Sequence, residues 1–308
     1  MKRRLLFHRD FRAYQGGHGK VWDYYRHTAI HPRWEPRVYF TSESISAGNP
    51  WRESAAEGIE HAWAPDQADA LFLAGMDLLA WPCDLDDRPV VNFIQHVRHA
   101  DNGSDVNAFL GRRAIRICVS DAVANALRTC GVRGPVVTID AALDLAETEP
   151  CHLAYREGIA IGASKQPVLG SEMVVALRAR GKQVTLLDTP IPRHEYLAAL
   201  SRADIAVLLP NPREGFYLPA LEAMALGCVT VVPDCVGNRA YVQAGVNALI
   251  PEYTLDGLLE AVCRLDDTLL RERLRSSGSA NAARFSQARE RQAFHAVLDD
   301  LPALWAAA

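Results

Sequence analysis

The sequence of 308 residues lacks the patterns that define several common protein classes. Its seven cysteines form no Cys-x-x-Cys pair, and no histidines have the spacing that would complete a zinc site. We expect reduced thiols that serve as small apolar residues. Only three apolar residues, beginning at Leu5, follow the basic start, and no apolar stretch is long enough to cross a bilayer. We therefore expect neither an export signal nor a membrane span.

An excess of charge of one sign is also missing. The formal net charge is −4, and neither half of the chain is strongly basic, which argues against a nucleic-acid partner. Apolar residues make up 49% and charged residues 23%, as is ordinary for a globular protein, and the length suits two domains of about 150 residues each. We expect a cytoplasmic protein, with peripheral contact at the inner face of the membrane left open. The sequence does not indicate an oligomeric state.

The glycine-rich segment near the start matches neither common phosphate-binding motif. Gln15-Gly-Gly-His-Gly-Lys20 follows a short apolar strand and precedes eight residues with helical periodicity. It is not Gly-x-Gly-x-x-Gly, and no Ser or Thr follows the lysine as in a P-loop. A strand, a glycine-rich turn and a helix form a general ligand loop, and a plain connecting turn explains the segment equally well.

Short apolar runs alternate with helical segments along the whole chain. Runs that predict strands lie at residues 5–7, 37–41, 70–74, 88–94, 114–119, 136–139, 158–162, 183–187, 204–209 and 228–232. Residues 42–66 are polar and predict a helix and loops, and the polar segment 146–150 marks a domain boundary. This alternation predicts an α/β fold with parallel sheets and right-handed crossovers in both halves.

Residues 210–227, with the sequence Pro-Asn-Pro-Arg-Glu-Gly-Phe-Tyr-Leu-Pro-Ala-Leu-Glu-Ala-Met-Ala-Leu-Gly, are the most informative stretch. They follow a buried strand, and Pro219 and Gly227 are placed to begin and end an apolar helix. Glu222 is the one ionisable residue of that helix, in its expected first turn, and Glu214 lies eight residues earlier, on the loop facing the same helix mouth. A buried carboxylate needs partners, and open α/β sheets bind ligands beyond the carboxyl ends of their strands. For Glu222 alone, interaction with the helix dipole, worth about 0.3–1 kcal/mol, is an equal explanation.

The complete string resembles the Glu-x7-Glu signature of the retaining GT-B glycosyltransferases, in the family-four group (glycosyl transferases group 1) that uses nucleotide sugars. The resemblance is strongest from Asp204 to Pro251 and approximate over the first half. It implies GT-B architecture, with two Rossmann-like domains whose parallel sheets face each other across a cleft. Residues 1–146 would form the acceptor side and residues 147–284 the nucleotide-sugar domain. The C-terminal helix, residues 285–308, would pack back onto the first domain.

The resemblance also assigns roles around the two glutamates. Glu222 would accept hydrogen bonds from the ribose hydroxyls of the donor, and Glu214 would contact the hydroxyls of the donor sugar. Backbone groups would lie near the diphosphate. They belong to Gly215, Phe216, Tyr217 and Leu218.

Further ligand contacts follow from the same resemblance. His96 comes after the strand at residues 88–94 and would face the transferred sugar, although a hydrogen-bonded histidine at a strand end is the structural alternative. Gly16 and Gly17 would let the backbone approach the donor or the acceptor. Gly237 and Asn238 resemble the glycine turn that the family places near the sugar diphosphate.

The chain departs from the family pattern at three places. Ala163 follows the glycine at the end of the strand 158–162, where the family presents an Arg that grips the diphosphate. Lys165 is then the only nearby cation and our candidate phosphate contact, with Arg213 as a further contributor. Tyr217 falls where many relatives have Gly. The Asn-Gly turn that ends the family's first domain is replaced by two alanines, Ala141 and Ala142.

Together these features predict a metal-independent retaining glycosyltransferase of the hexosyltransferase type, using a UDP- or GDP-sugar, with no cofactor and no metal. Asp84-Leu-Asp86 looks like a loop and not a metal-binding Asp-x-Asp at a strand end. The acceptor would be a glycan, a lipid-linked molecule or a small molecule of bacterial-type glycan biosynthesis. The main alternative, motivated by Ala163 and the compact length, is a non-catalytic glycosyltransferase-like subunit that binds nucleotide or glycan. A sugar-nucleotide epimerase is a third, and a hydrolase with two carboxylates fits the apolar helix poorly.

Overall fold

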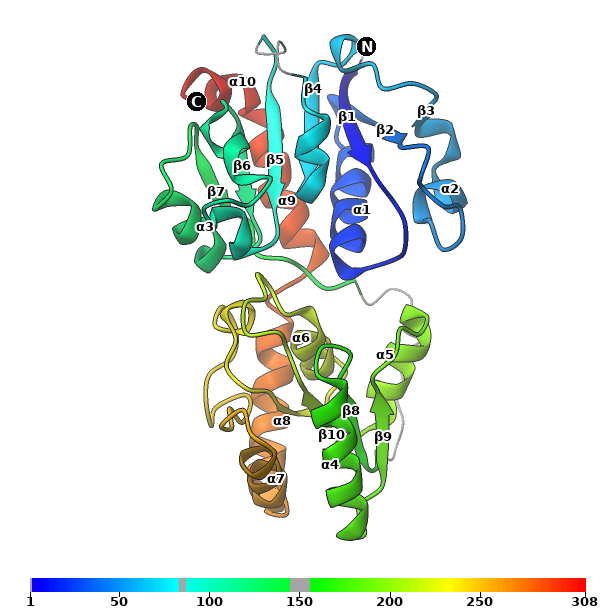
Figure 1. Cartoon of the computed structure of the whole chain (residues 1–308), viewed down its shortest axis with the longest axis vertical. Coiled ribbons are helices and arrows are strands. Elements are labelled where there is room, and N and C mark those ends of the chain that lie inside the picture. Colours follow the sequence, from blue (N-terminus) through cyan, green and yellow to red (C-terminus); the bar gives the residue numbers. More distant parts are fainter. Residues whose placement is uncertain (1, 83–86, 145–155) are drawn as a thin grey trace. The chain divides into compact units, whose positions relative to one another are not determined.

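The computed structural model describes residues 2–82, 87–144 and 156–308 (Figure 1). The chain forms two compact units, one of Met1–Ala141 with Ala288–Ala308 and one of Ala142–Gln287. The boundary expected at residues 146–147 and the loop Asp84-Leu-Asp86 both lie outside the described residues. Among the described residues, no helix combines the length and the apolar character needed to cross a bilayer.

The first unit is built on a seven-stranded, wholly parallel sheet. In spatial order its strands are β3 (Ile59–Glu60), β2 (Trp34–Phe40), β1 (Arg3–Arg9), β4 (Ala70–Ala74), β5 (Val90–Ile94), β6 (Ile115–Cys118) and β7 (Val136–Thr138). Its helices are α1 (Gly16–Ala29), α2 (Pro50–Ser54), α3 (Asp121–Arg128), α9 (Gln287–Asp299) and α10 (Leu301–Ala306). The segment 42–66, expected to hold only a helix and loops, also supplies β3. A two-residue edge strand is too short to leave an alternating pattern in the sequence.

Helices α1 and α9 lie side by side on one face of this sheet (Figure 1). The ring of Tyr24 in α1 is 4.7 Å from that of Phe294 in α9, and both rings contact Phe72 of β4. The C-terminal segment, about 270 residues distant in the sequence from α1, is thus part of the core of the first unit.

The second unit has a four-stranded parallel sheet. In spatial order its strands are β11 (Val229–Val231), β10 (Ile205–Leu208), β8 (Ile159–Gly162) and β9 (Val184–Leu187). Its helices are α4 (Pro167–Ala179), α5 (Arg193–Arg202), α6 (Leu218–Ala225), α7 (Leu255–Arg264) and α8 (Thr268–Ala282). Short 3-10 helices of the chain are η1 (Ala56–Gly58), η2 (Pro65–Gln67), η3 (Gly75–Ala80), η4 (Val97–Ala100), η5 (Asn107–Gly111) and η6 (Val236–Asn238).

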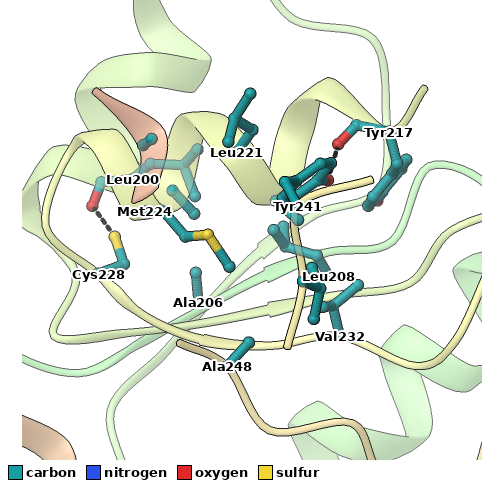
Figure 2. Packing of buried hydrophobic residues seen from close by; sticks show 14 of the residues in the cluster. Leu200, Ala206, Leu208, Tyr217, Leu221, Met224, Cys228, Val232, Tyr241 and Ala248 are labelled. Carbon is teal, nitrogen blue, oxygen red and sulfur yellow. Dashed lines mark hydrogen bonds between the residues drawn. The ribbon is translucent and has the colours of Figure 1, made fainter. Parts of the chain in front are cut away.

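The residues of β10 alternate between two hydrophobic clusters, one on each face of the sheet. Ala206 and Leu208 pack with α5, α6 and α8, whereas Ile205 and Val207 pack with α4 and α7. Figure 2 shows the first cluster, where Met224 of α6 lies over Ala206. A strand buried on both faces reads as the continuous apolar run seen in the sequence.

A buried charge network joins α1 to α9. The ammonium group of Lys20 donates to Asp23 Oδ2 at 2.8 Å and lies 2.7 Å from Glu290 Oε1. His27 Nε2 lies 3.0 Å from Glu290 Oε2. Burial alone would lower the pKa of Lys20, but attraction by Glu290 and Asp23 outweighs burial and raises it above the ordinary value. The lysine is therefore charged and is the cation that the two carboxylates share, while Asp23 also pairs with Arg26 at 2.6 Å.

The substitution Lys20→Met is expected to lower the free energy of unfolding by about 3–5 kcal/mol, because it leaves the buried carboxylates without their shared cation. Urea denaturation measures the loss. Arg33→Met is the matched control, since Arg33 pairs with Asp299 of the same helix α9 but both side chains are more than half exposed. The control is expected to cost less than about 1 kcal/mol. Equal losses in the two variants would contradict this account.

Candidate functional site

The loops that carry most of the predicted donor-binding residues emerge from one edge of the second sheet. All four strands are parallel, so their carboxyl ends lie together. Lys165 follows β8, Arg213 and Glu214 follow β10, and Gly237 follows β11. This edge is where an open α/β sheet binds its ligand.

The Glu214 loop and the Gly237 turn are in direct contact. Tyr217 N donates to Gly237 O at 3.0 Å, and Val236 N donates to Pro212 O at 3.0 Å. A Cβ at position 237 would lie 2.8 Å from Tyr217 N and 3.0 Å from the Glu214 carbonyl oxygen. Glycine at this position lets the two loops approach, and this packing sets the position of Glu214.

The Asn238 side chain shapes the same turn. It is fully buried, its Oδ1 accepts from Cys235 N at 3.2 Å, and its Nδ2 donates to Pro233 O at 2.8 Å. Residues Val236–Asn238 of this turn form the 3-10 helix η6. The amide of Asn238 is thus used to hold the loop.

Glu222 lies in the second turn of α6, not in the first turn as expected. The helix begins at Leu218, one residue before Pro219, which makes Glu222 its fifth residue. Gly227 ends the helix with a φ of +80°, which confirms the predicted end. Because the dipole effect falls off within the first turn, it no longer explains the carboxylate.

The partner of Glu222 is Arg193, the first residue of α5. Arg193 Nη1 donates to Glu222 Oε1 at 2.5 Å, and Nη2 donates to the carbonyl oxygen of Asp144 at 2.8 Å. The Glu222 side chain is 3% exposed and that of Arg193 is 26% exposed. The sequence required a partner but did not identify it, since Arg193 is 29 residues away and no spacing rule connects the two helices. One feature of the sequence could have pointed to Arg193: a helix that follows β9 must begin at the same carboxyl edge of the sheet as α6.

Two tyrosines surround this ion pair. Burial, followed by the negative charge of Glu222, raises the pKa of Tyr196 well above its ordinary value. Burial, with Cys235 and then Glu222 adding to it, raises the pKa of Tyr241 as well. The Tyr241 hydroxyl donates to the carbonyl oxygen of Tyr217, the residue before α6 (Figure 2). Both tyrosines are therefore neutral donors beside a buried ion pair.

The phosphate-binding groups differ from the expected set. Tyr217 N donates to Gly237 O, and Leu218 N lies 3.2 Å from Phe216 O, so two of the four expected backbone donors are engaged within the protein. Tyr217 itself is buried in the core of the second unit. Lys165 and Arg213 are both exposed on their loops. Both stay candidate phosphate contacts at this sheet edge.

Ala163, which stands where the family presents Arg, is a packing residue. It is fully buried, and a Cβ on Gly170 of α4 would lie 2.3 Å from the Ala163 Cβ. Helix α4 therefore approaches β8 closely at this point, which favours the small side chain.

The first unit brings its three predicted ligand residues to one edge of its sheet. Gly16 and Gly17 form the first turn of α1, whereas a turn before the helix was expected. Gln95 Nε2, at the end of β5, donates to Gly17 O at 3.1 Å. The next residue, His96, accepts from Arg98 N through its Nδ1 at 3.0 Å and so caps η4. The hydrogen-bonded histidine considered for this strand end is thus present, and a contact with sugar stays a prediction.

Solved structures with the same arrangement define the class of fold. Sucrose-phosphate synthase from Thermosynechococcus elongatus is 15% identical with a TM-score of 0.73, over 98% of this chain and 100% of that chain. HepE from Anabaena, solved with UDP and glucose, is 15% identical with a TM-score of 0.74, over 97% of this chain and 100% of that chain. The fold is GT-B, as predicted.

Residues 159–267 match the family model described as glycosyl transferases group 1. A D-inositol 3-phosphate glycosyltransferase from Jonesia denitrificans is 28% identical over 240 residues, which are 76% of this chain and 52% of that protein. The chain thus spans about half the length of this relative. The resemblance to the group 1 glycosyltransferases seen in the sequence is thus confirmed over residues 159–267.

Two glycine substitutions test whether the predicted glycines serve packing or ligand approach. Gly237→Ala is expected to lower the free energy of unfolding by about 1–3 kcal/mol, because the new Cβ meets backbone atoms. Gly16→Ala meets nothing within 4 Å and is expected to leave thermal stability unchanged or slightly raised. A weaker ligand affinity in a stable Gly16→Ala protein would place ligand at Gly16, and a fully stable Gly237→Ala protein would refute the packing role.

Arg193→Met is expected to destabilise the second unit by about 3–5 kcal/mol, because the buried Glu222 carboxylate loses its cation. Arg239→Met is the matched control in the same unit, since Arg239 pairs with Asp234 and both side chains are more than half exposed. Denaturant midpoints of the two variants measure the difference. A loss below about 1 kcal/mol for Arg193→Met would show that the ion pair is not what keeps Glu222 buried.

Proposed function

We propose that this chain is a metal-independent, retaining glycosyltransferase that moves a sugar from a nucleotide-sugar donor to an acceptor. The observation that carries the proposal is the buried Glu222–Arg193 pair, set at the carboxyl edge of the second sheet, inside the segment that matches the family model. Solved structures of similar fold contain UDP or UDP-glucose, which supports a nucleotide sugar as the donor.

Glu222 is the proposed acceptor of the donor's ribose hydroxyls. Arg193 Nη1 donates a charge-assisted hydrogen bond to Glu222 Oε1 at 2.5 Å. The guanidinium also bonds to the Asp144 carbonyl oxygen, so the carboxylate is held between α5 and α6 in one orientation. Arg193 is therefore a positioning residue for the donor.

The departing diphosphate would be bound by Lys165 and Arg213, with the amino-terminal end of α6 favouring its negative charge. Glu214, held by the Gly237 turn, would contact the hydroxyls of the donor sugar. In the first unit, Gly17 and His96 stay our candidate ligand contacts because both lie at the carboxyl edge of its sheet.

In the proposed reaction the acceptor oxygen forms a bond to the anomeric carbon on the face from which the diphosphate leaves. The bond between that carbon and the phosphate oxygen breaks, and its electron pair stays on the diphosphate. The acceptor proton passes to a diphosphate oxygen, so that no protein nucleophile and no metal are needed. Retention of configuration follows from attack on the departing face.

A non-catalytic subunit that binds nucleotide is the second candidate, because Ala163 removes one expected phosphate ligand and is a core contact here. We also propose that the protein acts in the cytoplasm in bacterial-type glycan biosynthesis. Its acceptor would be a glycan, a lipid-linked molecule or a small molecule.

Thermal-shift measurements with UDP, GDP, ADP and their sugars test the donor site. A nucleotide at a hundred times its dissociation constant is expected to stabilise the protein by about 2.7 kcal/mol. Glu222→Ala is expected to abolish this shift, whereas Glu195→Ala, an exposed acid on α5, is expected to keep it. If no nucleotide stabilises the wild-type protein, the proposed function is wrong.

Turnover with a bound donor separates the two candidates. The transferase is expected to form product at an unchanged rate in EDTA, and NMR of the first product formed should show the donor's anomeric configuration. Loss of activity in EDTA, or an inverted product, contradicts the proposed mechanism. Nucleotide binding without turnover across an acceptor panel supports the non-catalytic subunit.

A further inference from the structure

A buried polar cluster outside the predicted site lies where β1 and β4 end. Arg9, the last residue of β1, is 6% exposed and donates through Nη1 to Asp77 of η3, which follows β4. Its Nη2 lies 2.5 Å from Nδ1 of His18 in the first turns of α1. His8 Nδ1 lies 3.2 Å from the other oxygen of Asp77. The order of strands reverses between β1 and β4, and such a switch point is where open α/β sheets bind ligands.

The cluster fixes the tautomer of His18. A guanidinium group only donates hydrogen bonds, so Nδ1 of His18 must accept and the ring proton must lie on Nε2. Burial first, and then the positive charge of Arg9, lower the pKa of His18 to about 4, while Asp77 and Asp10 oppose the shift. The ring is therefore neutral at physiological pH. Within residues 2–82, 87–144 and 156–308, Nε2 of this half-buried ring has no hydrogen-bond partner.

Large apolar side chains are exposed in the loops at this edge of the sheet. Four exposed large side chains lie in the loops after β1, β2 and β4, with exposed fractions from 43% to 54%. They are Tyr14, Ile45, Met76 and Leu79.

Hydrogen bonds and close contacts connect three of these loops to the cluster. Ile45 N donates to Phe11 O at 2.8 Å, and the Phe11 ring is 4.9 Å from the ring of His18. Met76 immediately precedes Asp77. A Cβ on Gly19, next to His18, would lie 2.5 Å from the Tyr14 hydroxyl oxygen.

The charges of the cluster cancel. Arg9 and Asp77 form a buried pair, His18 is neutral, and Asp10 is paired with Arg12. The group offered to a ligand is therefore an uncharged N–H donor, at a sheet edge where large apolar side chains are exposed. Such a donor suits a hydroxyl oxygen better than a phosphate or carboxylate, which would need an uncompensated positive charge.

We propose that this cluster is an acceptor-binding site, in which His18 Nε2 donates a hydrogen bond to a hydroxyl oxygen of an uncharged acceptor that carries an apolar group. Arg9 and Asp77 are positioning residues that hold the His18 tautomer. That the ligand is the acceptor of a transfer reaction rests on the proposed glycosyltransferase function. The chemistry of the ligand follows from the cluster itself.

Binding to the full chain without nucleotide tests the site. Phenyl glycosides of glucose, galactose and mannose are titrated beside their methyl glycosides and the corresponding hexose 6-phosphates, with calorimetry or NMR as the readout. At least one phenyl glycoside is expected to bind about tenfold tighter than its methyl counterpart, and no 6-phosphate should bind tighter than its phenyl counterpart. Absence of binding by all three phenyl glycosides, or tightest binding by a phosphate, overturns the proposal.

Two substitutions isolate the hydrogen bond. His18→Phe keeps a ring against Phe11 but removes the donor, and is expected to weaken binding about tenfold. His18→Gln retains an N–H donor near the position of Nε2 and is expected to bind within about threefold of wild type. Unchanged affinity in a folded His18→Phe protein, with folding checked by its melting temperature, overturns the role of His18.

The pH dependence separates this neutral donor from an ordinary histidine. Affinity is expected to stay constant from about pH 5.5 to about pH 8, because a ring with a pKa of about 4 does not titrate there. A change in affinity centred near pH 6.5 would contradict a neutral His18. The other histidine ring that faces Asp77 is that of His8.

Failure of this site and failure of the proposed function give different results. Glu222→Ala is expected to bind the phenyl glycoside like wild type while losing nucleotide stabilisation. His18→Phe is expected to keep nucleotide stabilisation in full. Nucleotide binding without glycoside binding overturns only the acceptor site, and the reverse overturns only the transferase.

Discussion

The cost of burying a charge governs the candidate donor site. Glu222 sits in an otherwise apolar helix, where an unpaired carboxylate would cost several kcal/mol, and it is retained only because Arg193 reaches it from α5. The same guanidinium bonds to Asp144, so one interaction holds two helices and the start of the second unit together. Replacing the pair by apolar residues would often be neutral or stabilising in proteins. Stability alone therefore does not explain the pair, and its place at the carboxyl edge of the sheet fits the ligand role proposed above.

The first unit contains two buried charge networks, and the cost of burying charge is met differently in each. Lys20 and Glu290 are almost fully buried, their charges are satisfied by each other and by neighbours, and the network joins α1 to α9. Arg9 and Asp77 are equally buried, but their pairing leaves the neighbouring His18 with a fixed tautomer and an available N–H. In the first network the charged groups pair with one another, and the network holds the chain's last helices in the unit. In the second network one N–H donor, at the sheet edge, remains available to a ligand. This difference separates a structural network from a candidate site.

Much of the fold could be predicted from local pattern, and the site only in part. Strands buried on both faces leave continuous apolar runs, and Gly227 with its positive φ marks the end of α6, so these elements were found to within a few residues. The edge strand β3 is too short to leave a pattern. The prediction that Glu222 lies in the first turn of its helix was wrong, because α6 begins one residue before Pro219. The rule that disfavours a helical residue before proline is a bias with exceptions. Arg193 and the Arg9 cluster could not be found, since their contacts join segments that no spacing rule relates.

At Ala163 the chain has a packing residue where the family has a ligand-binding arginine. Close approach of α4 at Gly170 favours a small side chain there, so the cation that the family places at this turn is absent from it. The backbone of the Glu214 loop compensates little, because Tyr217 N already bonds to the Gly237 carbonyl oxygen. In the proposed function, phosphate binding would therefore rest on exposed side chains such as Lys165, whose charges are screened by salt. The Glu222–Arg193 pair, whose carboxylate is 3% exposed, is the part of the proposed donor site that the protein's own hydrogen bonds already hold in place.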